Sequence, residues 1–319
     1  MSELKDYLIQ DLTNMPKYLS KVTRSGLSGF APCVITCAVT GMQQSKKQNE
    51  YLPVTFEEQA QAAEEAYQAG ASMVHLHVRN QQNTDYPTAD PNDFLTVNKM
   101  LRERCPDLIV NDTVGGGYLR FDKSDSLGKP YDIAATSLAE VASVDVEGVG
   151  QGPIDGPNAA YTITPGEMGR LCDTLLAHDT TPEFECFDIG DFIMVNQMIA
   201  TGRLGDGPYL VDLVINPACD FQSPSYLIEA MKYVPENSIV TIIATGAGQW
   251  PMLATAIALG LNIRVGMEDN IYLKRGVRAK SNKELVEKAV ALCELLDRRV
   301  ATPAEAREMM GLGEPRQYE

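Results

Sequence analysis

The sequence of 319 residues has little positive charge. Its 27 lysine and arginine residues stand against 43 aspartate and glutamate residues, so the formal net charge is −16 and the isoelectric point is near 4.7. A field of that sign repels phosphate backbones and anionic lipids. The composition therefore argues against nucleic acid and membrane surfaces as partners.

Long apolar runs, a signal sequence and paired cysteine motifs are also missing. No apolar run approaches the ~20 residues of a membrane span. The opening residues 1–6 include acidic side chains and lead into no apolar run, so we expect no signal peptide. The seven cysteines are scattered and include no Cys-x-x-Cys pair, which argues against a disulfide framework and a cysteine zinc site. We therefore expect a cytoplasmic protein with reduced thiols.

What the sequence does contain is a regular series of short apolar runs. They are rich in valine and isoleucine and closer to continuous than alternating, which is typical of strands buried on both faces. Segments with helical caps lie between them, such as Glu57–Ala69 after Thr55 and Glu167–Leu176 after Thr164. The predicted strands are Cys33–Thr40, Ser72–Val78, Leu108–Asp112, Glu140–Val146, Glu183–Phe187, Tyr209–Ile215, Ser238–Ala244 and Asn262–Met267.

The alternation of these strands with helices indicates either a (β/α)8 barrel or a large doubly wound sheet. The repeat runs from Cys33 to about Gly266, which fits the roughly 250 residues of one barrel, and no Gly/Ser/Pro-rich linker interrupts it. We therefore predict an N-terminal extension at residues 1–30, packed on the barrel or on a neighbouring subunit. Residues 31–319 are predicted to form a single (β/α)8 TIM barrel catalytic domain with C-terminal helices, in which Gly115–Lys129 is a long loop. The remaining predicted helices are Pro91–Arg104, Phe192–Thr201, Ser223–Lys232, Trp250–Leu259, Ser281–Leu296 and Pro303–Met310.

Polar and reactive side chains stand at the C-terminal end of nearly every predicted strand. Barrel enzymes build their active sites from those ends, although charge at a strand end also has the ordinary explanation of solvation. The convergence of several carboxylates on one face favours a barrel with a catalytic site. The residues concerned are Thr40, His75, His77, Asn111, Asp112, Asp145, Glu147, Glu185, Asp188, Asn216, Thr245, Glu268 and Asp269.

The sharpest single motif is Val74-His75-Leu76-His77-Val78-Arg79. Residues i and i+2 of a strand point to the same side, with Cα atoms roughly 6.6–7 Å apart, a span that one metal ion can bridge. The chain has three histidines, and two of them stand in this motif. The alternative is a pair of core histidines bonded to neighbouring backbone. For a His-x-His pair on an apolar barrel strand we favour metal binding.

A third metal ligand is expected from the segment Arg264-Val265-Gly266-Met267-Glu268-Asp269-Asn270, at the end of the eighth predicted strand. Two histidines leave a divalent site short of protein ligands, and the Glu268 carboxylate is the candidate third. Asp269 beside it could act as a base on a carbon acid. A surface ion pair between Arg264 and Glu268 is the alternative, but the flanking residues are apolar and strand-like.

Two glycine-rich segments follow predicted strands, Thr113-Val114-Gly115-Gly116-Gly117 and Thr245-Gly246-Ala247-Gly248. The second opens a helix after the seventh strand, where barrels often bind phosphate at helix N-termini. Tight turning explains such segments about as well as ligand approach, so both interpretations stay open.

Together these motifs resemble those of the β-keto acid cleavage enzymes, over about Pro32 to Leu312 of the chain. The strand His75–Arg79 combined with the segment Arg264–Tyr272 is specific, because we know no other family that has both. The other matching segments are Thr36–Gly41, Pro182–Glu185, Ser281–Val286 and Ala301–Arg307.

The resemblance implies a (β/α)8 barrel that binds Zn²⁺ through His75, His77 and Glu268. It also implies a reaction in which a β-keto acid and acetyl-CoA, the co-substrate, give acetoacetate and a new acyl-CoA. Addition to the thioester and a retro-Claisen C–C cleavage would complete that exchange. Members of this family are homo-oligomers, so the resemblance implies one here, expected to be a tetramer.

The resemblance also implies roles for catalytic side chains. Asp269, oriented by Arg264 and a hydroxyl, would be the base. The family's hydroxyl residues correspond to Thr113 and Ser143, and a family carboxylate near the site corresponds to Glu185.

Two positions that bear on the substrate depart from the family pattern. Members acting on a cationic amino substrate carry a glutamate in the first loop, where this chain has Gln43. A neutral amide offers no ionic partner to an ammonium group, so we do not expect an amino-keto acid substrate. The glycine-rich loop after the sixth strand is replaced by a segment that begins at Asn216, and we expect Asn216, Thr245 and Gly246 to contribute to the substrate and thioester pocket.

Two other functions stay open. A metal-dependent hydrolase of the amidohydrolase type also uses His-x-His, but it needs further histidines, and only His178 remains, at a predicted helix end. In a non-catalytic barrel that binds a metabolite or a metal, the site carboxylates would have no catalytic role.

The binding of CoA needs a cationic surface, because CoA is an anion. We expect that surface at the mouth of the barrel, at Lys274, Arg275, Arg278 and Lys280. The alternative is that these residues are an ordinary solvated run of charges.

Overall fold

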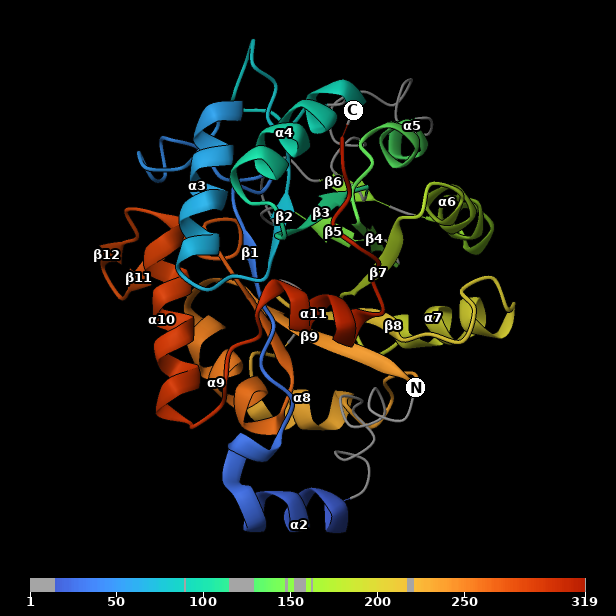
Figure 1. The fold of residues 1–319 in the computed structure, drawn as a ribbon, viewed down its shortest axis with the longest axis vertical. Coiled ribbons are helices and arrows are strands. Elements are labelled where there is room, and N and C mark those ends of the chain that lie inside the picture. Colours follow the sequence, from blue (N-terminus) through green and yellow to red (C-terminus); the bar gives the residue numbers. More distant parts are fainter. Residues whose placement is uncertain are drawn as a thin grey trace.

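The computed structural model describes residues 15–88, 90–114, 129–146, 149–151, 159–161, 163–216 and 221–318. Within these residues eight parallel strands close into a barrel in the order β1-β10-β9-β8-β7-β4-β3-β2, with helices around it (Figure 1). The chain is therefore a (β/α)8 TIM barrel, as predicted. The barrel strands are β1 (Ile35–Ala38), β2 (Met73–Leu76), β3 (Ile109–Thr113), β4 (Val141–Asp145), β7 (Thr181–Cys186), β8 (Tyr209–Ile215), β9 (Ser238–Ala244) and β10 (Asn262–Val265).

Helices follow the strands at the positions that the sequence predicts, with one addition. The caps form: the Thr55 hydroxyl accepts from the backbone of Glu58, and the Glu58 carboxylate accepts from that of Thr55. At the start of the predicted helix Ser281–Leu296, the Ser281 hydroxyl accepts from the backbone N–H of Glu284, and the Glu284 carboxylate accepts from the backbone N–H of Lys280. The helices are α3 (Phe56–Gln68), α4 (Pro91–Arg104), α5 (Lys129–Thr136), α6 (Pro165–Ala177), α7 (Asp191–Ala200), α8 (Pro224–Ala230), α9 (Gln249–Leu259) and α10 (Asn282–Leu295), and α5 is the one not predicted.

The inside of the barrel is apolar at one end and polar further along. The first inward-facing residues of the strands pack with helix α11 (Pro303–Met310), which lies across the barrel in Figure 1, as a separate apolar cluster. Because alternate residues of a strand share a face, the next inward positions lie two residues on, and they are polar and buried. The barrel interior therefore has an apolar layer of side chains followed by a polar layer. The apolar layer includes Val34, Met73, Ile109, Val141, Leu210 and Ile239, and the polar layer includes Thr36, His75, Asn111, Ser143, Asp212, Thr241 and Arg264.

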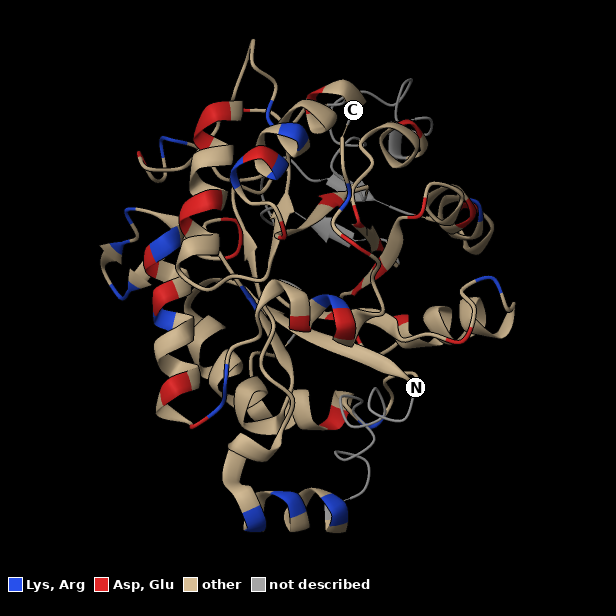
Figure 2. Ribbon diagram, viewed as in Figure 1, with Lys and Arg blue, Asp and Glu red and all other residues tan. Residues whose placement is uncertain are grey.

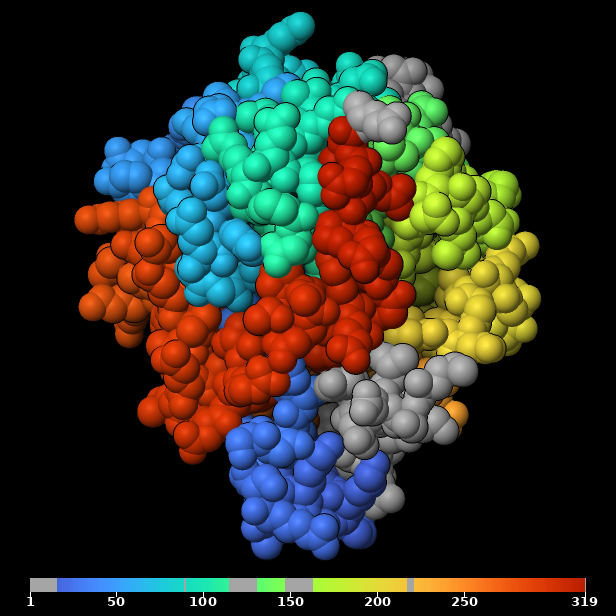
Figure 3. Space-filling view, in the orientation of Figure 1, coloured from blue at the N-terminus to red at the C-terminus, as the bar shows by residue number. Residues whose placement is uncertain are grey.

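Three pieces lie outside the barrel repeat. Helix α2 (Met15–Ser25) projects from the barrel at the bottom of Figures 1 and 3. The Tyr18 hydroxyl on this helix donates to the carbonyl of Ala258 at 2.9 Å, so this part of the N-terminal extension contacts α9. Two hairpins follow barrel strands, β5 (Val149–Gln151) with β6 (Ala159–Tyr161) and β11 (Tyr272–Lys274) with β12 (Val277–Arg278). None of the described helices is both long and apolar enough to cross a bilayer.

Some predictions fall on other parts of the chain. Residues 1–14 of the extension, residues 115–128 of the predicted long loop, Glu147 and residues 217–219 lie outside the described residues. Lys129, the last residue of that predicted loop, begins α5.

Candidate active site

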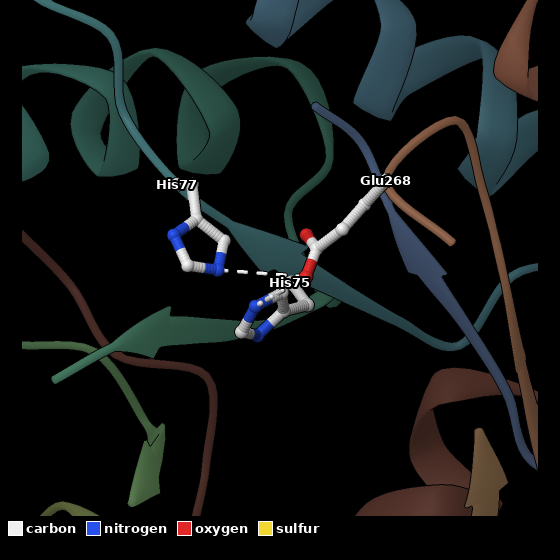
Figure 4. A group of neighbouring side chains, drawn as sticks. All are labelled: His75, His77 and Glu268. Carbon is white, nitrogen blue, oxygen red and sulfur yellow. Dashed lines mark ion pairs between the residues drawn. The ribbon is translucent and has the colours of Figure 1, made fainter. Parts of the chain in front are cut away.

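Three predicted ligands come together at the C-terminal ends of β2 and β10. The Nε2 atoms of His75 and His77 lie 3.6 Å and 3.4 Å from the same carboxylate oxygen, Oε1 of Glu268 (Figure 4). One ligand atom from each residue lies within 4.8 Å of the others. The two imidazole rings meet edge to face, with centroids 5.0 Å apart. The spacing on one strand and the distant glutamate thus form a group that could hold one metal ion.

Two glycines allow the backbone to bring Glu268 to this place. Gly266 has φ +143°, and a Cβ there would lie 2.0 Å from the carbonyl oxygen of Ala38 on β1. Gly41 has φ +68°, and a Cβ there would lie 2.6 Å from Cγ of Glu268. The loop after β1 therefore passes directly over the Glu268 side chain, and the Gln44 amide donates to the Glu268 carbonyl.

Two of the three donor groups, His75 and Glu268, are in the protonation state that a metal ion requires. Burial lowers the pKa of His75 to about 4, so its imidazole is neutral. Burial alone would raise the pKa of Glu268, but His77, His75 and Arg264 outweigh it and hold that pKa well below its ordinary value. Within the described residues, His75 Nε2 and Glu268 Oε2 are buried and make no hydrogen bond. Two imidazole nitrogens and a carboxylate with unsatisfied atoms fit a catalytic divalent site.

One arginine joins the candidate metal ligand Glu268 to the candidate base Asp269. The Arg264 guanidinium donates to Asp269 through Nε at 3.1 Å and NH2 at 2.9 Å, and the same NH2 lies 3.1 Å from Glu268 Oε1. Its NH1 donates to Glu185 Oε1 at 2.9 Å. Arg264 is 4% exposed and its ion pair with Glu268 is largely buried, so this is not the surface pair considered as an alternative. Burial raises the pKa of Asp269 to about 6, against the opposing charge of Arg264.

More acidic groups lie next to this network. Glu183 and Asp212 are deeply buried and Asp145 is half-buried. Burial is the largest cause that raises the pKa of each, to about 7 for Glu183. Glu183 is hydrogen bonded to Asp212, and Asp145 to Glu185, so these carboxyl groups lie in two close pairs. The sequence offered a signal for them, since Glu183 and Glu185 are alternate residues of one strand and Asp212 interrupts an apolar run. Glu183 and Asp212 are nevertheless not among the predicted site residues.

The predicted catalytic residues are brought together to different degrees. Ser143 lies against His75, with Oγ 3.2 Å from Nδ1, and Thr113 is its register partner on β3 and is also buried. The backbone N–H of Gly246 donates to the carbonyl of Asp269 at 2.9 Å, which attaches the glycine-rich loop to the candidate base.

For the other predicted binding residues the structure gives positions relative to strands and loops. Thr245 follows β9 and its N–H donates to the carbonyl of Ile215, while Asn216 directly follows β8. Gln43 is exposed in the loop after β1, next to Gln44. His178 caps the C-terminus of α6, which leads into the start of β7 and thus the opposite end of the barrel from the two paired histidines.

The chain is similar to several characterised proteins. The family model described as beta-keto acid cleavage enzyme matches residues 32–312. A 3-keto-5-aminohexanoate cleavage enzyme of Fusobacterium nucleatum is 35% identical over 283 residues, which are 88% of this chain and 97% of that one. A 3-oxoadipate:acetyl-CoA acetyltransferase of Cupriavidus necator is 29% identical over 285 residues, 88% of this chain and 95% of that one. A solved binary complex of ObcA with oxaloacetate shares the fold, with a TM-score of 0.65, 21% identity, and 82% of this chain and 68% of that chain covered.

Proposed function

Since the chain belongs to the beta-keto acid cleavage enzyme family, we propose that it condenses a β-keto acid with acetyl-CoA and releases acetoacetate and a new acyl-CoA. The chain is an enzyme by its family and curated relatives, one of which is named for acetyl-CoA. The observation that carries the proposal is that one guanidinium, that of Arg264, binds the carboxylates of both Glu268 and Asp269. A metal ligand and a base are thereby held side by side.

The proposal includes Zn²⁺ between His75, His77 and Glu268. Two nitrogen donors and one oxygen donor suit zinc, and three protein ligands leave positions for substrate. Bound there, Zn²⁺ would act as a Lewis acid that polarises the ketone oxygen of the keto acid. The buried atoms His75 Nε2 and Glu268 Oε2, which make no hydrogen bond within the described part of the chain, support this assignment.

Asp269 is the proposed base. The acidic proton of a β-keto acid is on the carbon between the carboxylate and the ketone, and a carboxylate oxygen of Asp269 would remove it. Arg264 fixes the plane of this carboxylate with two hydrogen bonds, while Glu185 binds the guanidinium through its NH1. The orientation of the base is therefore set before the substrate binds, which is the condition for efficient proton transfer.

The carbon–carbon exchange balances without another reactant. The deprotonated carbon bonds to the acetyl carbonyl carbon, and the C–S bond breaks to release the CoA thiolate. The thiolate adds to the original ketone carbon, and the bond from that carbon to the former nucleophile breaks. The acetoacetate carbanion regains the proton held by Asp269, and the rest of the keto acid leaves as its CoA thioester.

The remaining predicted residues are proposed to bind and stabilise. The hydroxyls of Thr113 and Ser143 would donate to oxygens that gain negative charge during the reaction. The exposed hairpin β11–β12, with Lys274, Arg275 and Arg278, would attract the phosphates of CoA to a chain of net charge −16 (Figure 2). Substrate-binding roles are proposed for Gln43, Asn216, Thr245 and Gly246.

A homo-oligomer, expected to be a tetramer, and a cytoplasmic location complete the proposal. The six described cysteines are buried free thiols, which a reducing compartment preserves. Light scattering after gel filtration tests the oligomer, with a mass of about four chains as the expected result.

The direct test is an assay with zinc-loaded protein, acetyl-CoA and a panel of β-keto acids that carry neutral, acidic and cationic side groups. Mass spectrometry should detect acetoacetate together with a new acyl-CoA for at least one neutral or acidic member. Zinc-loaded protein that gives neither product with any of them would contradict the proposal. A metal-dependent hydrolase of the amidohydrolase type would release no acyl-CoA. It would also need further histidine ligands, and His178 does not supply one, because it caps the C-terminus of α6.

A further inference from the structure

A buried polar chain leads away from His75 on the side opposite the metal ligands. Its Nδ1 lies 3.3 Å from Oδ1 of Asn111 and 3.2 Å from the hydroxyl of Ser143. The Asn111 amide nitrogen donates to Oε2 of Glu183, which is in turn hydrogen bonded to Asp212. His75, Asn111, Ser143 and Glu183 are at most 2% exposed, so water does not compete for these atoms.

The direction of these hydrogen bonds follows from what each group can donate. A carboxylate oxygen accepts, so Glu183 turns the Asn111 amide with its NH2 toward Glu183 and its carbonyl oxygen toward His75. The Ser143 hydroxyl has one hydrogen and lies 3.0 Å from Asn111 Oδ1, 3.4 Å from Glu183 Oε2 and 3.2 Å from His75 Nδ1. When His75 carries an Nδ1–H, the hydroxyl hydrogen is left for one of the two oxygen acceptors, and the hydroxyl oxygen can accept from the ring. A bare Nδ1 lone pair would face the lone pairs of the Asn111 oxygen, whereas an Nδ1–H would donate to it.

We propose that Glu183 and Asn111 are positioning residues that hold the His75 ring in the Nδ1–H tautomer. The lone pair of Nε2 is then free to bind a metal ion together with Glu268, whose Oε1 lies 3.6 Å from Nε2. A histidine that binds a metal through one nitrogen commonly donates from the other to an oxygen, which fixes both tautomer and ring orientation. The consequence for zinc rests on the proposed function, while the tautomer itself is a property of the metal-free protein.

The chain offers matched variants for a test. Glu183→Met keeps the volume and removes the acceptor, so the Asn111 amide is free to turn its NH2 toward Nδ1 and favour the wrong tautomer. Glu183→Gln keeps an acceptor oxygen and is the conservative rescue. Asp112→Asn is the control, because Asp112 is next to Asn111 on β3 but faces the Asn98 side chain of α4.

The first measurement is long-range ¹H–¹⁵N NMR of the histidine rings in zinc-free protein, where only three histidines give signals. We expect Nδ1–H at His75 in the wild type, in Glu183→Gln and in Asp112→Asn, and loss of that preference in Glu183→Met and Asn111→Leu. The second measurement is competitive zinc titration, in which those last two variants should bind about 10–100-fold more weakly. Circular dichroism confirms that each variant folds.

Three outcomes would overturn the inference. The first is a wild-type His75 that carries its proton on Nε2, which needs no variant to detect. The second is a folded Glu183→Met that keeps the Nδ1–H tautomer and the zinc affinity of the wild type. The third is an Asp112→Asn that changes the tautomer as much as Glu183→Met, since that would indicate a general packing effect. A wild type that binds no zinc but shows Nδ1–H would contradict the proposed function and leave this inference standing.

Discussion

Arg264 holds Asp269 with two atoms of one guanidinium, Nε to Oδ2 at 3.1 Å and NH2 to Oδ1 at 2.9 Å. The same group also binds Glu268 and Glu185, so it orients three carboxylates at once. A planar guanidinium with five donors can do this, whereas an ammonium is a point charge on a flexible stem. The carboxylates of Asp269 and Glu268 therefore cannot reorient independently of each other.

Arg264→Lys is expected to lower kcat/KM by about 100-fold or more, because a lysine keeps the charge but cannot fix the plane of the Asp269 carboxylate. Steady-state kinetics on zinc-loaded protein measure the effect. Arg102→Lys is the control, since Arg102 is equally buried but binds Glu140 at 2.8 Å outside the barrel. It should lose stability and keep its activity, and equal losses of activity in both variants would argue against a role for Arg264 in orientation.

Asp269→Asn is expected to remove turnover by a factor of about 10²–10⁴ and to leave the zinc content unchanged, because the amide cannot accept the substrate proton but does not alter the three ligands. Turnover and zinc content are measured on the same preparation. A variant with near wild-type turnover would show that Asp269 is not the base. A non-catalytic barrel would show no turnover to lose.

The barrel was predictable from the sequence because its strands are buried on both faces and their apolar runs are nearly continuous. The eight strands lie where those runs stand, and the cap residues Thr55 and Thr164 begin helices as expected. Helix α5 and the two hairpins were not predicted. The strands of the hairpins are only two or three residues long, which is too short for a periodic pattern of apolar residues to show in the sequence.

The candidate site was predictable only in part, for a physical reason. His75 and His77 share a short motif, and Glu268 follows an apolar strand, so local pattern identifies them. The deeper pairing of Glu183 with Asp212 depends on the register of β7 and β8 and on burial, neither of which the sequence displays. The fit of Asn111 to His75 likewise depends on the neighbouring register of β2 and β3.

Gln43→Glu is expected to raise kcat/KM for a β-keto acid with a cationic amino group several-fold relative to a neutral one. The added carboxylate supplies the ionic partner that an amide lacks, and because Gln43 is exposed the gain is modest. Competition between the two substrates in one assay measures the ratio directly. An unchanged ratio would mean that this position does not contact the substrate side group. Gln48→Glu, in an exposed part of the same loop, is the charge-matched control.

Asp112 is expected to make stability depend on pH. Burial raises its pKa from the ordinary 3.8 to about 7, although Asn98 and Ser137 donate hydrogen bonds to it. Between these values the folded chain binds a proton that the unfolded chain does not, so the free energy of unfolding falls as the pH rises through this window.

Asp112→Asn should remove this contribution, because the amide does not titrate. Relative to the wild type, the free energy of unfolding of the variant should rise by roughly 2–4 kcal/mol between about pH 4 and pH 8. Urea unfolding of both proteins across this range measures the difference, and contributions from all other groups cancel in the comparison. A difference between variant and wild type that stays constant with pH would mean that the pKa of Asp112 is the same in the folded and the unfolded chain.

The central claim is that His75, His77 and Glu268 together bind one zinc ion, and elemental analysis of the purified chain tests it most directly. After reconstitution and removal of loose metal, the wild type and Asp269→Asn should each hold one zinc per chain, while His75→Ala, His77→Ala and Glu268→Gln should hold little. A wild type without zinc, or ligand variants that keep a full equivalent, would contradict the account.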